Sequence, residues 1–236
     1  MNMNDFGLGK LLDSIGGALH IFDFSFFISG SVTLAIVVID VIAHCGRSWI
    51  DTLVAFPAWI VVMVTLLSIY VCGLMSWSIG RELRKTFISD DELCGDPELC
   101  DFTHTFDSLV ESLGLREEDL PSITNKLDIY YYMWIKLDSL GNDNVKGRLA
   151  YCNRMWVMRA LFEGLLFSWL LCILTLMDLF LSVKWFPLYS VWYTLPVLIL
   201  LIVLMRFTYK SATNYANSQI KEIVIAYKVY VLDKIN

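Results

Sequence analysis

Three acidic residues stand inside strongly apolar stretches: Asp40, Glu163 and Asp178. A carboxylate at the centre of a bilayer costs about 2.5–3.5 kcal/mol on the insertion scale, so such side chains usually face protein or water. Asp40 and Asp178 are each near the end of an apolar stretch. They are therefore predicted either to line a shared polar pocket or cation site, or to lie one turn from the interface and pair with Arg47 or Lys184. The second interpretation needs no special function.

Glu163 follows Arg159 by four residues, so a helix would place both side chains on one face. The sequence predicts a local ion pair between them that neutralises the carboxylate. Because the order Arg before Glu makes the weaker helical pair, an alternative is that these residues bind across a subunit interface.

Cysteine and histidine side chains near the middle of the chain are of metal-binding type. Cys94, Cys100 and His104, with the more distant Cys152, have the spacing C-x5-C-x3-H, which lacks the close cysteine pair of structural zinc sites. We therefore expect no metal and no cofactor.

A run of acidic residues overlaps this region and has the composition of a calcium loop, but not the order of ligands in an EF-hand. We interpret it as a solvated acidic face that could dock a protein partner. Its members are Asp90, Asp91, Glu92, Asp96, Glu98 and Asp101.

Catalytic motifs are missing from the sequence. It contains no phosphate-binding loop, nucleophile elbow, zincin helix or dinucleotide fingerprint. The histidines His20, His44 and His104 are expected in three different environments: interfacial, outer and cytoplasmic. We expect the protein not to be an enzyme.

Composition predicts which elements must position these residues. Hydrophobic residues make up 57 % of the 236 residues, against about 45–50 % in soluble domains. Four apolar stretches, 24–44, 53–77, 155–183 and 188–205, are each long enough to cross a bilayer. Only short linkers separate the first two and the last two. The predicted fold is an all-α integral membrane protein with four transmembrane helices in two hairpins.

The distribution of basic residues predicts the orientation. Arg81, Arg84 and Lys85 follow the second stretch, whereas the short linkers contain only Arg47 and Lys184. The positive-inside rule then places both termini in the cytoplasm, in what we expect to be a bacterial inner membrane. The predicted segments are an interfacial amphipathic helix (1–23), the first hairpin (24–77), an acidic cytoplasmic helical insert (78–154), the second hairpin (155–205) and a cytoplasmic C-terminal helix that extends the fourth span (206–236).

The predicted insert carries the negative charge of the protein. Residues 78–157 hold fifteen acidic and nine basic residues, which equals the whole net charge of −6. This argues against direct nucleic-acid binding, which needs clustered Lys and Arg. Helices are predicted from Thr103 to Gly114 and from Pro121 to Gly141, followed by a helix capped by Asp143 or Asn144 that continues into the third span.

Two apolar stripes need a surface to cover them: the first is predicted to be covered by other helices of the insert or by a partner, and the second is predicted to pack on a neighbouring molecule. One, in the insert, is a partner-docking candidate and contains Ile123, Leu127, Tyr130 and Trp134. The other, after the fourth span, is a self-association candidate and contains Tyr209, Ala212, Ala216, Ile220, Ile223 and Tyr227.

Two classes of function are consistent with this organisation. The first is an oligomeric membrane sensor or scaffold subunit that recruits or regulates a cytoplasmic partner. In architecture alone it resembles small four-helix membrane subunits of bacterial immunity systems, which implies a role in defence or stress. The second is an oligomeric, cation-preferring channel or pore-forming effector whose acidic insert forms the inner vestibule.

Overall fold

The computed structural model describes residues 21–46, 55–86, 100–123, 125–182 and 191–232. Within these residues the chain is all-helical and has no strand. The helices are α2 (Ile21–Cys45), α4 (Ala58–Thr86), α5 (Cys100–Ser112), the 3-10 turn η2 (Glu117–Asp119), α6 (Lys126–Ser139), α7 (Asp143–Ser182), α8 (Val191–Tyr227) and the π-helical turn η4 (Lys228–Leu232).

Four of these helices, α2, α4, α7 and α8, are long and apolar enough to cross a membrane, as predicted. α7 has 40 residues and α8 has 37. At about 1.5 Å per residue each is roughly 55–60 Å long, about twice the hydrocarbon thickness of a bilayer. The predicted interfacial helix falls mostly on residues outside the described ranges, and its last residues, 21–23, begin α2.

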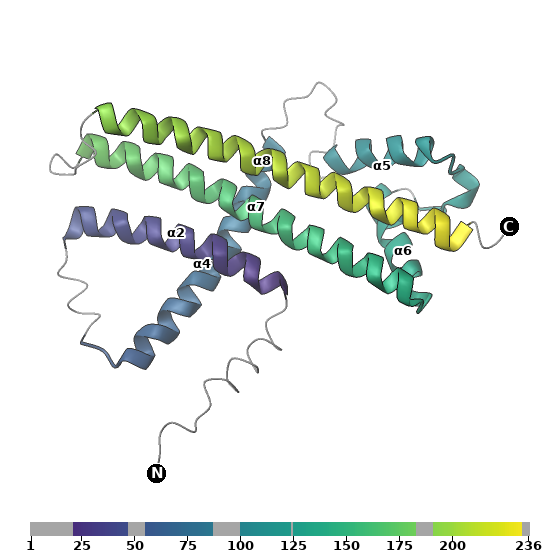
Figure 1. The fold of residues 1–236 in the computed structure, drawn as a ribbon, viewed down its shortest axis with the longest axis horizontal. Helices are drawn as coiled ribbons and strands as arrows, with labels where there is room; N and C mark the ends of the chain where they lie inside the picture. Colours follow the sequence, from purple (N-terminus) through teal and green to yellow (C-terminus); the bar gives the residue numbers. More distant parts are fainter. Residues whose placement is uncertain (1–20, 47–54, 87–99, 124, 183–190, 233–236) are drawn as a thin grey trace, which may run out of the picture.

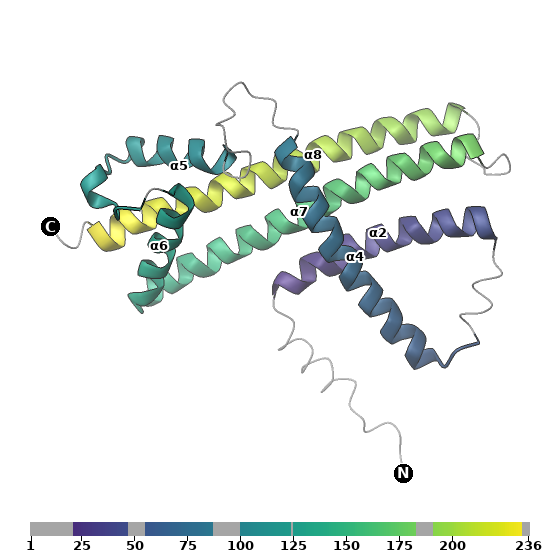
Figure 2. The same ribbon diagram turned by 180° about the vertical axis from the view of Figure 1, so that it is seen from behind.

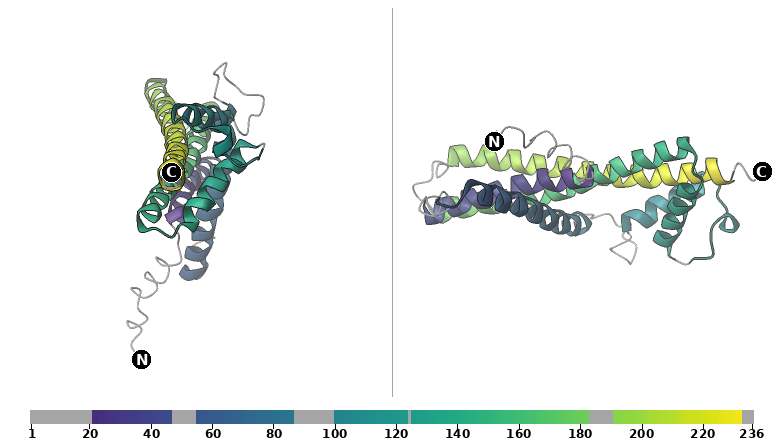
Figure 3. Two further views of the ribbon diagram at one scale, coloured as in Figure 1. Left: turned by 90° about the vertical axis from the view of Figure 1, so that its right-hand side faces the viewer. Right: turned by 90° about the horizontal axis from the view of Figure 1, so that it is seen from below.

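The helices divide the molecule into two halves that share α7 and α8. α2 and α4 accompany one half of the α7–α8 pair, and α5 and α6 accompany the other (Figures 1 and 3). α2, α7 and α8 run nearly alongside one another, whereas α4 crosses α2 and α7 obliquely (Figures 1 and 2). We call the half that contains α5 and α6 the distal bundle and the half that contains α2 and α4 the apolar half.

Small residues allow the close crossing of α4. Its buried residues are Gly73, Ser76, Gly80 and Arg84, spaced by three and four, so they form one stripe. A Cβ atom on Gly73 would lie 2.0 Å from the backbone oxygen of Phe26 in α2, and one on Gly80 would lie 1.7 Å from that of Glu163 in α7. The rest of α4 exposes large apolar side chains, as expected of a lipid-facing helix.

Helix ends in the distal bundle follow local signals. Gly114 and Gly141 have φ of +63° just after α5 and α6, so both predicted stops are confirmed. The starts differ from the prediction. α6 begins at Lys126, where the Asn125 side chain accepts a hydrogen bond from the Leu127 amide, and Asn142 caps α7 by accepting from the Asn144 amide.

The distal bundle has its own hydrophobic core, made by α5, α6, the first part of α7 and the last part of α8. Phe106, Met133, Leu137 and Ile223 are fully buried in it. Polar contacts between its helices include Arg148 with Glu222 at 2.9 Å and Thr105 with Asn217 at 3.0 Å.

This core involves the stripe predicted for self-association. Ala212, Ala216, Ile220, Ile223 and Tyr227 are buried within the chain itself, and only Tyr209 of the set is half-buried. The premise that this face needs a neighbouring molecule to cover it is therefore corrected. Self-association through it stays a prediction that would require α5, α6 or α7 to move away.

Candidate functional site: a buried ion network and a carboxylate–histidine cluster

The most deeply buried charges surround Glu163, halfway along α7. Glu163 is 1 % exposed, and its Oε1 accepts hydrogen bonds from Arg84 Nε at 2.8 Å and Arg159 Nε at 2.9 Å. Its Oε2 accepts from Trp77 Nε1 at 3.0 Å. We call these four residues the Glu163 network. The predicted Arg159–Glu163 contact is present, and α4 adds two further donors.

The network carries an excess of positive charge. One carboxylate faces two guanidinium groups, and Arg84 is itself only 3 % exposed. Buried charges are tolerated when they are paired and hydrogen-bonded, and each Glu163 oxygen has at least one donor. The network joins α4 to α7 where the distal bundle begins. A change in the tilt of α4 would therefore move Arg84 and Trp77 relative to Glu163.

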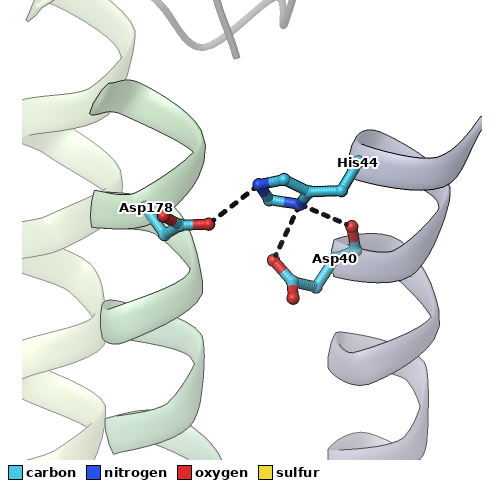
Figure 4. A group of neighbouring side chains, drawn as sticks. All are labelled: Asp40, His44 and Asp178. Atoms are coloured by element: carbon cyan, nitrogen blue, oxygen red, sulfur yellow. Dashed lines mark hydrogen bonds and ion pairs between the residues drawn. The ribbon is translucent and has the colours of Figure 1, made fainter. Parts of the chain in front are cut away.

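A second cluster lies near the C-terminal ends of α2 and α7. His44 Nε2 is 3.1 Å from Asp178 Oδ2, and His44 Nδ1 is 3.0 Å from the backbone oxygen of Asp40 and 3.6 Å from its Oδ1 (Figure 4). One ligand atom from each residue lies within 4.8 Å of those of the other two, and all three side chains are partly exposed. The two acids predicted to share a polar site are thus near each other, with His44 between them.

The chemistry of His44 limits what this cluster can be. Both ring nitrogens face oxygen acceptors, and a neutral imidazole has only one N–H to donate. The geometry therefore suits an imidazolium that donates from both nitrogens. It equally suits a neutral ring that donates from Nδ1 and coordinates a divalent cation through Nε2, with carboxylate oxygens as further ligands.

These two states predict opposite effects of pH. The imidazolium clamp between α2 and α7 stabilises the fold fully below about pH 6.5, the ordinary pKa of histidine, and is lost as the pH rises above that value. We expect the melting temperature in neutral detergent to fall between about pH 5.5 and pH 8. His44→Gln should remove much of this dependence. A melting temperature that instead rises with pH and falls on chelation would contradict the clamp and favour a bound metal.

Hydroxyl groups connect the three helices between these two sites. Thr33 Oγ1 in α2 is 2.8 Å from Ser76 Oγ in α4 and 2.8 Å from Ser168 Oγ in α7. Ser76 and Ser168 also donate to backbone oxygens one turn earlier, as expected for hydroxyls in apolar helices. Each of these three buried hydroxyls thus has a hydrogen-bond partner within the protein.

The other predicted site residues are dispersed. Asp90, Asp91, Glu92, Asp96 and Glu98 lie outside the described residues, as does Cys94, and Asp101 belongs to α5. His104 is exposed on α5, and Cys152 is buried in the distal core. Nothing in this arrangement tests the metal prediction for the cysteines.

The predicted docking stripe is only partly exposed. α6 buries Ile129, Tyr130, Met133 and Leu137, a face that shares only Tyr130 with the four docking candidates. Ile123 precedes α6 and is 38 % exposed, while Leu127 and Trp134 are half-buried. Partner docking by these residues stays a prediction.

Three residues of these two sites, Arg84, Trp77 and His44, were not predicted as site members. Arg84 resembles any of the basic residues after the second span, and only the crossing of α4 over α7 brings it to Glu163. His44 is four residues after Asp40, which was a usable signal, since that spacing places both on one helical face.

Comparison of the chain with protein-family models, with curated proteins and with solved structures finds no match.

Proposed function

We propose that this chain is a non-enzymatic, oligomeric membrane sensor or scaffold subunit that recruits or regulates a cytoplasmic protein partner, in a bacterial defence or stress system. The observation that supports this proposal is the continuity of α7 and α8 between the two halves of the molecule. Each is one continuous helix, and the two pack on each other. In the apolar half α7 also packs on α2 and α4. In the distal bundle α7 packs on α6, and α8 packs on α5 and α6. A displacement in the apolar half would thereby reach the distal bundle mechanically.

The proposed topology has two hairpins, with the distal bundle and both termini on the cytoplasmic side of the inner membrane. Basic residues support it, because Arg81, Arg84 and Lys85 lie at the end of α4 next to the distal bundle, and Arg148 and Arg154 lie in the first part of α7, within the bundle. The Asp40–His44–Asp178 cluster would then face the outside, and the Glu163 network would lie near the inner interface.

The experiment that tests this function neutralises the acidic run. Replacing the six acids by Asn or Gln should slow association with the partner that co-purifies from mild detergent, because docking to a charged surface is steered electrostatically. The effect should be larger at low ionic strength, where the Debye length is about 30 Å at 0.01 M against about 8 Å at 0.15 M. The replaced residues are Asp90, Asp91, Glu92, Asp96, Glu98 and Asp101.

A matched control variant removes six exposed acids elsewhere in the distal bundle and should leave association largely unchanged. These are Glu111, Glu117, Glu118, Asp128, Asp138 and Asp143. Equal slowing by both variants would contradict a specific docking surface. A loss of cation conductance in reconstituted bilayers without any partner would replace the scaffold by the channel.

A further inference from the structure

A cavity of about 400 Å³ opens beside the Glu163 network, at the junction of the two halves. Every long helix of the distal bundle contributes to its wall, and α4 closes it from the apolar half. The residues that matter for its chemistry are Trp77, Arg81, Tyr130, Trp134, Trp156 and Arg159. Its volume is within the range of small-molecule sites, about 300–1,000 Å³.

The charge of this wall is positive. Arg159 lines the cavity and shares the single carboxylate of Glu163 with Arg84, so two guanidinium groups face one negative charge. Arg81 also lines the cavity, is exposed, and has no ion-pair partner among the residues that the structure describes. Glu163 also lines the cavity, whereas Arg84 binds Glu163 without lining it, and together the three arginines and one glutamate leave an excess of two positive charges. Guanidinium groups bind phosphate oxygens with bidentate geometry.

A buried hydroxyl on the same wall is available as a donor. Tyr130 is 5 % exposed, and its Oη makes no well-formed hydrogen bond in the described part of the chain, with the side chain of Gln219, also on the cavity wall, as its polar neighbour. Burial raises the pKa of the Tyr130 phenol, so the group stays protonated and can only gain by donating. An anionic oxygen in the cavity would accept this bond.

The aromatic residues indicate where the ligand comes from. Trp77 and Trp156 line the cavity at the positions where the second span ends and the third begins. Tryptophan is enriched at the level of lipid headgroups, where an apolar ring and a polar edge are both accommodated. The cavity therefore combines basic groups for a phosphate with aromatic walls for the apolar part of the same molecule.

We propose that this cavity binds the phosphate group of an anionic phospholipid from the cytoplasmic leaflet. The assignment deepens the proposed function and rests on its topology, since it names the membrane component that the Glu163 network would sense. Arg81 and Arg159 contact the phosphate, Tyr130 donates to it, and Trp77 and Trp156 pack on the glycerol and the first carbons of the acyl chains. Occupancy adds a negative charge beside Arg159 and so changes how strongly it binds Glu163.

The test measures lipid binding by the purified full-length chain in uncharged detergent, by native mass spectrometry with phosphatidylglycerol and with phosphatidylcholine. We expect selective retention of phosphatidylglycerol, with apparent affinity about tenfold lower in Arg81→Gln, because one charge-assisted bond is lost. Tyr130→Phe should lower it about threefold. Arg154→Gln is the matched control, because Arg154 is an exposed arginine of α7 that does not line the cavity.

Equal loss in Arg81→Gln and Arg154→Gln would overturn the site, since it would show unspecific attraction of anionic lipid. Equal retention of phosphatidylcholine would overturn the charge selectivity. Displacement of the lipid by millimolar inorganic phosphate or a nucleoside monophosphate would overturn the lipid as the source and indicate a soluble phosphate ligand. No cytoplasmic partner is present in this assay, so its failure is distinct from failure of the docking experiment.

Discussion

Glu163→Gln is expected to destabilise the protein more than any other single change of charge in the described chain. The substitution keeps the shape of the side chain but leaves Arg84 and Arg159 facing each other without an anion, and Arg84 is almost fully buried. Breaking a buried ion pair by removing one partner typically costs about 3–5 kcal/mol of unfolding free energy. The measurement is the free energy of unfolding by SDS titration in mixed micelles.

Glu82→Gln is the matched control on α4. Glu82 pairs with Lys85 at 3.1 Å, but its side chain is 67 % exposed, so its loss should cost less than about 1 kcal/mol. A double-mutant cycle supplies a second criterion. The double variant Arg84→Gln, Glu163→Gln should lose much less unfolding free energy than the sum of the losses in the two single variants. The reason is that Arg84→Gln removes a charge that Glu163→Gln had left unpaired. Additive losses would show that Arg84 and Glu163 do not interact.

The prediction of the fold from sequence succeeded where the physics is local or dominated by hydropathy. A long apolar stretch predicts a spanning helix because no water is available to satisfy its backbone, so α2, α4, α7 and α8 follow from composition. Gly114 and Gly141 mark helix ends because a positive φ suits glycine. The start of α6 was missed, because Pro121 and Asn125 are both acceptable helix starts, and the helix begins after Asn125, whose side chain accepts a hydrogen bond from the Leu127 amide.

The candidate site was predictable only within one helix. The Arg159–Glu163 contact follows from their spacing by four. The contacts of Glu163 with Arg84 and Trp77 depend on how α4 crosses α7, a property that helical periodicity does not contain. Likewise, the distal bundle covers the apolar face of α8 with α5 and α6, whereas periodicity alone predicts an uncovered face.

The crossing itself provides the second large expected effect. Gly80→Ala should lower the free energy of unfolding by about 2 kcal/mol or more, because its Cβ would lie 1.7 Å from the backbone oxygen of Glu163 and 2.6 Å from its carbonyl carbon. The obstacle is backbone rather than the flexible end of a side chain, so α4 and α7 must separate. Their separation also lengthens the hydrogen bonds that Arg84 and Trp77 donate to Glu163.

Gly147→Ala on α7 is the control, and its effect should have the opposite sign. A Cβ there meets nothing within 4 Å, and alanine is favoured over glycine in a helix interior by up to about 1 kcal/mol, so this variant should be more stable than the wild type. The destabilisation by Gly80→Ala should also be smaller in a Glu163→Gln background, since both changes weaken the same contact between α4 and α7. If Gly80→Ala proved as stable as the wild type, α4 could not approach α7 as closely as the structure requires. The contact through which the apolar half is proposed to act on the distal bundle would then be absent.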